Sequence, residues 1–183
     1  MNTEGLHKEI KQSLRLLMNG VTVQSLREKG MDYHLNWGVN LLHLREMASQ
    51  YEPSLELATL LWADNIRECK ILATMLMPPT EFGEQTAREW INQTPTQEIA
   101  EIASKNLYCK LSFAKDLAIR LITSPDAMLQ LYGYCILGSL QNLSPEEKQQ
   151  ITLRANNTIN NTSLPLGLRH SAHNALLRME TIF

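Results

Sequence analysis

Helix signals follow one another at short intervals along this chain, and strand signals are nearly absent. Apolar residues recur at helical spacing, as in Ile66, Cys69, Leu72, Ala73 and Leu76. Helix-breaking residues separate such stripes: Gly20 is expected to end the first helix, and Pro78-Pro79 ends a later one. The sequence therefore predicts ten or eleven helices of modest length joined by short turns.

Two segments have the spacing of a capping box, in which a hydroxyl and a carboxylate or amide satisfy the first backbone N–H groups of a helix. Thr94-Pro95-Thr96-Gln97 has the T-x-x-Q form, and Ser144-Pro145-Glu146-Glu147 has the S-x-x-E form. We expect helices to begin after Thr94 and after Ser144. Many short helices with tight turns favour a stack of helical hairpins over a four-helix bundle, whose helices are longer. We therefore predict an all-α solenoid that forms one domain over residues 1–183.

Composition limits the functions that such a chain can have. The net charge of −2 argues against tight DNA binding by the whole surface, because phosphate neutralisation needs concentrated Lys and Arg. Only a local patch could bind DNA, and from Ile102 onward 8 Lys and Arg stand against 5 acids. The 3 cysteines are widely spaced and are interpreted as buried intracellular thiols. The charged start and the lack of a long apolar run predict a cytoplasmic protein with no membrane contact.

Several spaced elements resemble the opening signature of the DNA alkylation repair (AlkD-like) family. They are Asn36-Trp37-Gly38-Val39, Leu44-Arg45-Glu46-Met47-Ala48, Leu60-Leu61-Trp62 and Arg67-Glu68-Cys69. The resemblance implies a right-handed superhelical stack of HEAT/ARM-like hairpins with a concave, positively charged face that holds duplex DNA. It also implies excision of cationic N-alkylated purines, such as 3-methyladenine and 7-methylguanine, without a metal or cofactor.

In that family a carboxylate stabilises the developing charge on the sugar, two tryptophans pack beside the lesion, and an arginine supports the backbone. By the same resemblance, Glu101 falls on the position of the carboxylate, whereas Gln97 falls on a tryptophan position. The other positions fall near Met128, Gln130 and Leu131, and on His173 or Asn174.

Three hypotheses remain open from the sequence. The first is a relative that binds DNA or another macromolecule and has degenerate catalytic residues. The second is an alkylpurine DNA glycosylase that uses Glu101, and the third is a protein-binding scaffold. A solvated acidic face is the alternative interpretation of Glu98 and Glu101, which lie one turn apart.

Basic residues from successive C-terminal hairpins are the best candidates for DNA contacts, because repeats align equivalent surfaces. Together with Arg45, the predicted DNA-binding residues are Lys105, Lys110, Lys115, Arg154, Arg169 and Arg178. Arg67 is expected instead to cover neighbouring helices and to pair with an acid such as Glu68.

The remaining candidates are aromatic residues and histidines. Trp62 and Trp90 are expected in the core, and Trp37, in a connection, is the candidate for stacking on bases. His170 and His173 share a helix face but lack a third ligand at suitable spacing, so we assign no metal.

Overall fold

The computed structural model describes residues 2–94 and 96–181, and these ranges contain eleven α-helices, one short 3-10 helix and no β-strand. This confirms the predicted all-α class and the predicted number of helices. The elements are α1 (Thr3–Leu16), α2 (Gly20–Glu28), α3 (Leu41–Ala48), α4 (Leu55–Ala63), α5 (Arg67–Leu76), α6 (Glu84–Asn92), α7 (Gln97–Asn106), η1 (Tyr108–Lys110), α8 (Ala114–Ile122), α9 (Ala127–Leu137), α10 (Pro145–Asn160) and α11 (Leu166–Thr181).

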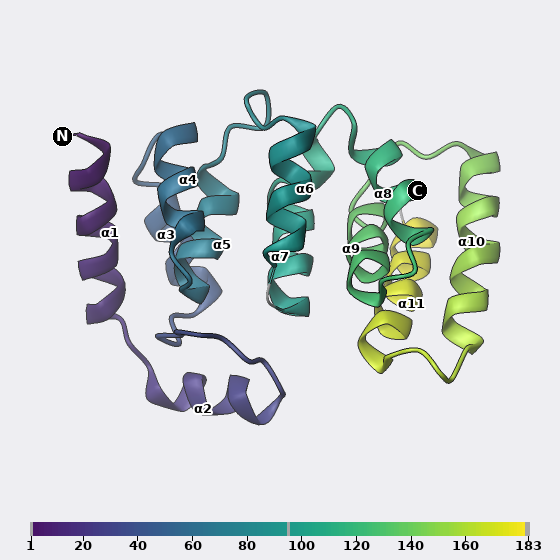
Figure 1. The fold of residues 1–183 in the computed structure, drawn as a ribbon, viewed down its shortest axis with the longest axis horizontal. Helices are drawn as coiled ribbons and strands as arrows, with labels where there is room; N and C mark the ends of the chain where they lie inside the picture. The colour runs from purple at the N-terminus through teal and green to yellow at the C-terminus, as the bar shows by residue number, and fades with distance from the viewer. Residues whose placement is uncertain (1, 95, 182–183) are drawn as a thin grey trace.

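The helices stack as successive hairpins along one axis of the molecule (Figure 1). We call α3, α5, α7, α9 and α11 the second-helix row, because each contacts the next in that order. The first helices α4, α8 and α10 pack against α5, α9 and α11, and α1 packs on α4. Helix α2 buries no residue and lies apart from this stack (Figure 1). The arrangement is the helical solenoid that the sequence predicts.

Close helix contacts depend on glycines in and after α9. A Cβ added at Gly133 would lie 2.9 Å from the Ala118 carbonyl oxygen of α8. A Cβ added at Gly138 would lie 3.0 Å from the Ala175 Cα of α11. Residues 131–138 are buried throughout, so α9 is enclosed by its neighbours.

Local capping explains where several helices begin. Ser144 caps α10 with the complete capping box that the sequence predicts. The prediction that Thr94 caps α7 is wrong. The Thr94 hydroxyl donates to the Trp90 carbonyl at the end of α6, and Thr96 caps α7 instead. Gly20 does not end the first helix; α1 stops at Leu16, and Gly20 is the first residue of α2.

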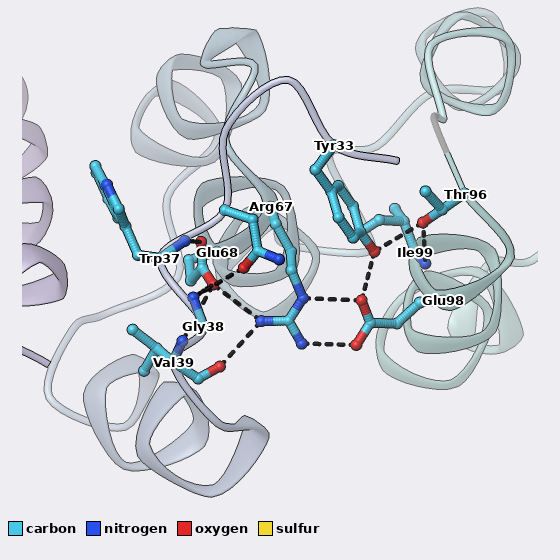
Figure 2. A network of polar contacts seen from close by, with 10 residues as sticks. Tyr33, Trp37, Gly38, Val39, Arg67, Glu68, Thr96, Glu98 and Ile99 are labelled. Carbon is cyan, nitrogen blue, oxygen red and sulfur yellow. Dashed lines mark hydrogen bonds and ion pairs between the residues drawn. The ribbon is translucent and has the colours of Figure 1, made fainter. Parts of the chain in front are cut away.

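A buried polar network ties the segment before α3 to α5 and α7 (Figure 2). The carboxylate of Glu68 is fully buried and accepts backbone N–H groups of Trp37, Gly38 and Val39 at 3.0–3.2 Å. Arg67 pairs with Glu68 at 2.9 Å, which confirms its predicted structural role. The same guanidinium makes two bonds to Glu98 of α7, at 2.8 and 2.6 Å.

This network corrects two expectations. Glu98 is not part of a solvated acidic face, because Arg67 and the Tyr33 hydroxyl both donate to its carboxylate. Trp37 is only 4% exposed, and the Arg15 guanidinium lies 5.7 Å from its ring centre, so stacking of Trp37 on bases is excluded in this structure. Trp62 and Trp90 lie in the core as predicted, stacked 4.1 Å apart.

No helix within the described ranges is both long enough and apolar enough to cross a membrane.

Candidate nucleic-acid interface

Glu101 lies at a shallow pocket where α7 and α11 approach each other over α9. Its carboxylate is exposed and accepts a hydrogen bond from the Gln97 side chain at 2.7 Å. The part of α9 that lines this pocket presents only small or buried residues, so the polar and charged groups around the Glu101 carboxylate come mainly from α11. The lining residues are Glu101, Tyr134, Cys135, Gly138, Ser171, Asn174, Ala175 and Arg178.

Cys135 is a potential nucleophile that lines the same pocket as Glu101, but its surroundings keep the thiol unreactive. Burial and, to a smaller extent, the negative charge of Glu101 raise the pKa of the Cys135 thiol to about 12. The thiol lies 3.9 Å from the Ser171 hydroxyl. At neutral pH the sulfur is therefore protonated and poorly nucleophilic.

The positions that correspond to the family's aromatic cradle hold no aromatic side chain. Gln97 reaches from α7 to α11, where its Oε1 lies 2.4 Å from the position that a Cβ of Gly167 would take. Gln130 donates to the Ser124 carbonyl at 2.7 Å, and His173 and Asn174 are exposed on α11. Every Trp, Tyr and Phe ring in the described ranges is buried or half-buried. The pocket thus offers a carboxylate without an exposed aromatic ring on which a base could stack.

Four of the predicted basic residues lie on the side of the molecule where the helices of the second-helix row have their C-terminal ends. We call Lys105, Lys110, Lys115 and Arg178 the C-terminal edge. Lys105 lies in the last turn of α7, and Arg178 lies in the last turn of α11. Lys110 and Lys115 line a second, polar pocket with Ser112, Ser139, Gln141 and Asn142. Gly138 lines the first pocket and Ser139 lines the second, so the two pockets flank the end of α9.

The lysines of the C-terminal edge differ in how firmly they are held. Lys115 pairs with Glu147 of α10 at 2.7 Å. Lys105 and Lys110 are exposed, and their ammonium groups have no ion pair or hydrogen bond to any described residue. Flexible, unpaired ammonium groups can follow a phosphate backbone.

The other predicted contacts lie away from this edge. Arg169 is half-buried near the start of α11, and its Nε has no partner among the described residues. Arg154 belongs to α10, outside the second-helix row, and donates Nε to the Ile122 carbonyl at 3.0 Å. Arg45 is exposed on α3, towards the opposite end of the row.

Residues 2–94 and 96–181 contain no group of three His, Cys, Asp or Glu side chains placed to hold a metal ion. Cys69, Cys109 and Cys135 are all free, but Cys109 is half-buried, so the expectation that all three are buried is wrong for this residue.

One basic surface escaped the sequence analysis. His7, Lys8, Lys11 and Arg15 share a face of α1 at helical spacing, together with Gln12. The i, i+4 and i+8 spacing of His7, Lys11 and Arg15 was the available signal.

Comparisons with known proteins identify a solved structure that has the same fold. No family model matches the sequence, and no curated protein matches it. One solved structure matches with a TM-score of 0.84 and 19% identity, over 93% of this chain and 74% of the other. That structure represents a new family of proteins related to the HEAT-like repeat DNA glycosylases, with affinity for branched DNA structures.

This chain has the HEAT-like repeat fold. The match confirms the predicted HEAT-like architecture. At 19% identity the match shows that the two proteins share a fold. What the present HEAT-like chain binds depends on its own residues.

Proposed function

We propose that this HEAT-like chain is a DNA-binding protein that contacts the phosphate backbone, including that of branched DNA, without excising bases. The observation that carries the proposal is the C-terminal edge, where Lys110, Lys115 and Arg178 line the two pockets at the end of α9. Lys105 adds a fourth cation in the last turn of α7. The affinity of the structurally similar protein for branched DNA supports the same choice of partner.

Backbone contact fits the side chains better than base recognition does. Lys and Arg neutralise phosphates whatever the sequence, and such contacts supply most non-specific affinity. Enzymes that extrude a base commonly hold it against aromatic side chains, and the described pocket has no exposed aromatic ring. We further propose that Arg45, Arg154 and Arg169 add weaker contacts, that no cofactor or metal takes part, and that the protein acts in the cytoplasm.

The test is fluorescence anisotropy with labelled linear duplex and with a four-way junction of the same arm sequence. Lys110→Glu should weaken binding to both by roughly tenfold, because it replaces attraction to phosphate with repulsion. Arg27→Glu makes the same charge change on exposed α2 and should leave binding nearly unchanged. Equal affinities for wild type and Lys110→Glu would contradict the proposed interface.

A glycosylase activity is the alternative that the exposed Glu101 carboxylate keeps open. Purified protein is incubated with duplex DNA carrying N-methylated purines, and free methylated base is quantified against Glu101→Gln. We expect no release from either protein. Release that depends on Glu101 would establish base excision and reject the proposal that catalysis is lost.

A protein-binding scaffold is the second alternative, and one feature favours it. An apolar groove runs between α8 and α10, with Ile119 and Leu153 exposed at its rim. If the protein shows no salt-dependent affinity for either DNA, the scaffold becomes the better interpretation.

A further inference from the structure

Helix α1 carries a second basic surface, which we call the α1 surface: His7, Lys8, Lys11, Gln12 and Arg15, which line a common hollow. Lys8 and Arg15 are separated by seven residues, which is about 10 Å along a helix axis. On one strand of B-DNA this distance corresponds to about three phosphates. The spacing therefore suits contact with a phosphate backbone.

Most side chains of the α1 surface are held in fixed positions. His7 and Lys11 both bond to Asp64, at 2.7 and 3.0 Å, and Arg15 lies over the ring of Trp37. Burial alone would raise the pKa of Asp64, but the bonds from His7 and Lys11 outweigh it and hold that pKa below its usual range.

The α1 surface keeps an excess of positive charge. Lys8, Lys11 and Arg15 outweigh Asp64 and Glu4, the exposed acid one turn before Lys8. Lys8 is exposed and has no ion pair or hydrogen bond among the described residues. Unlike Lys11, its ammonium group is free to bind an anion.

The α1 surface lies far along the stack from Lys115 and Arg178 of the C-terminal edge, because α1 lies at one end of the long axis and α8 and α11 lie towards the other (Figure 1). Between them, α6 and the turn before it carry Glu81, Glu84 and Glu89. Glu84 pairs with Arg88 and with Arg120 of α8, so this central region keeps only a small excess of negative charge. The order of charge along the molecule is therefore positive, negative, positive. A straight duplex that touched both basic regions would pass over this central region without gaining attraction from it, and Glu81 and Glu89, which have no ion pair among the described residues, would oppose it.

We propose that the α1 surface binds a second duplex arm of branched DNA while the C-terminal edge binds the first arm. This inference rests on the proposed function, because it needs the C-terminal edge to bind DNA. Two arms that diverge from a branch point can reach both basic regions and avoid the acidic centre. Linking two weak contacts in one ligand raises the overall affinity without any new contact.

The experiment compares junction and linear-duplex affinities, measured by anisotropy, in two matched variants. Lys8→Gln with Gln12→Glu lowers the charge of the α1 surface by two. Gln149→Glu with Asn156→Glu makes the same change at exposed positions of α10. We expect the α1 variant to lose roughly fivefold in junction affinity, with its salt slope reduced by about 1, and to keep its linear-duplex affinity.

A third variant distinguishes an effect of charge on DNA binding from an effect of damage to α1. Gln12→Lys adds a cation to the α1 surface and should strengthen junction binding by a few-fold, which misfolding cannot imitate. Unchanged junction affinity in both α1 variants, with duplex binding still sensitive to Lys110→Glu, would overturn the second-arm proposal alone. Failure of the wild type to bind any DNA would overturn the proposed function and this inference with it.

Discussion

The carboxylate of Glu68 holds an extended segment of chain against the first turn of α5. Three consecutive backbone N–H groups, from Trp37 to Val39, point to its two oxygens, and Arg67 balances its charge. Gly38 takes a φ of +74°, a conformation that L side chains rarely adopt, and the added Cβ would lie 2.3 Å from the Asn19 carbonyl oxygen. The segment that leads into α3 is thereby fixed by one buried charge and one glycine.

Replacing this carboxylate tests how much stability it provides. Glu68→Gln keeps the shape of the side chain but removes a negative charge that pairs with the buried Arg67 guanidinium. It also weakens three charge-assisted hydrogen bonds. We expect a loss of about 3 kcal/mol in the free energy of unfolding, measured with urea. Glu46→Gln changes an exposed carboxylate of α3 and should stay within about 0.5 kcal/mol of wild type.

The ion pair between Arg67 and Glu98 makes the folding stability depend on pH in the acidic range. Burial alone would raise the pKa of Glu98, but Arg67 and the Tyr33 hydroxyl outweigh it and lower that pKa. A carboxylate with a lowered folded-state pKa contributes stability above its unfolded pKa of about 4.3, and this contribution is lost as the pH falls further.

We therefore expect the melting temperature of wild type to fall below about pH 4.3 more steeply than that of Glu98→Gln. Thermal unfolding followed by circular dichroism between neutral pH and pH 3 measures the difference. Parallel curves for the two proteins would show that Glu98 does not contribute.

Residue roles were predictable where they depend on local pattern and not where they depend on distant partners. The pairing of Arg67 with the adjacent Glu68 followed from the sequence, whereas its contact with Glu98 spans 31 positions and leaves no periodic signal. Trp37 was placed on the surface because it lies in a connection, but that connection is packed under Arg15.

At the scale of elements, the contact between α8 and α9 depends on the absence of a side chain. Gly133→Ala would place a methyl group 2.7 Å from Ile122 Cγ2 and 2.9 Å from backbone atoms of α8. Since backbone cannot yield as a flexible side chain does, we expect a loss of about 1–3 kcal/mol in unfolding free energy despite the better helix propensity of alanine.

Gly20→Ala is the matched control, since no atom lies within 4 Å of the added Cβ and the site is exposed. Urea unfolding should place this variant within about 0.5 kcal/mol of wild type. A neutral Gly133→Ala would show that α8 and α9 can separate without cost.

Helices were predictable from apolar stripes, and their exact starts were predictable only where one cap was available. Ser144 has no competing hydroxyl nearby and caps α10 as expected. Thr94 and Thr96 both fit the start of α7, and Thr94 is already bonded to the preceding helix. The choice between them depends on the contact of Thr94 with α6, and helix propensity does not include such contacts.

At the scale of the whole molecule, DNA affinity should depend strongly on salt despite the net charge of −2. If the four cations of the C-terminal edge each neutralise one phosphate, the logarithm of the duplex association constant should fall with the logarithm of salt concentration at a slope of about −3 to −4. Anisotropy titrations at several salt concentrations give this slope. A slope near zero would show that the four cations do not contact phosphates together.

The solenoid itself followed from the sequence, but the grouping of charges did not. Whether a cation lies on the first or second helix of a hairpin decides which surface it joins, and the sequence pattern left this undecided for Lys115 and Arg154. Lys115 belongs to α8 and Arg154 to α10, which are first helices that alternate along the chain with the helices of the second-helix row. Only the packing of hairpins shows that Lys115 still reaches the pocket at the end of α9.

The burial of all three tryptophans has a spectroscopic consequence. Trp37, Trp62 and Trp90 are each no more than 4% exposed, and none lines either pocket at the end of α9. Their fluorescence emission should be centred at short wavelength in the folded protein and should shift to the red on unfolding. Nucleic acid at the C-terminal edge would not quench it, so intrinsic emission reports whether a variant is folded, independently of an extrinsic dye on the DNA.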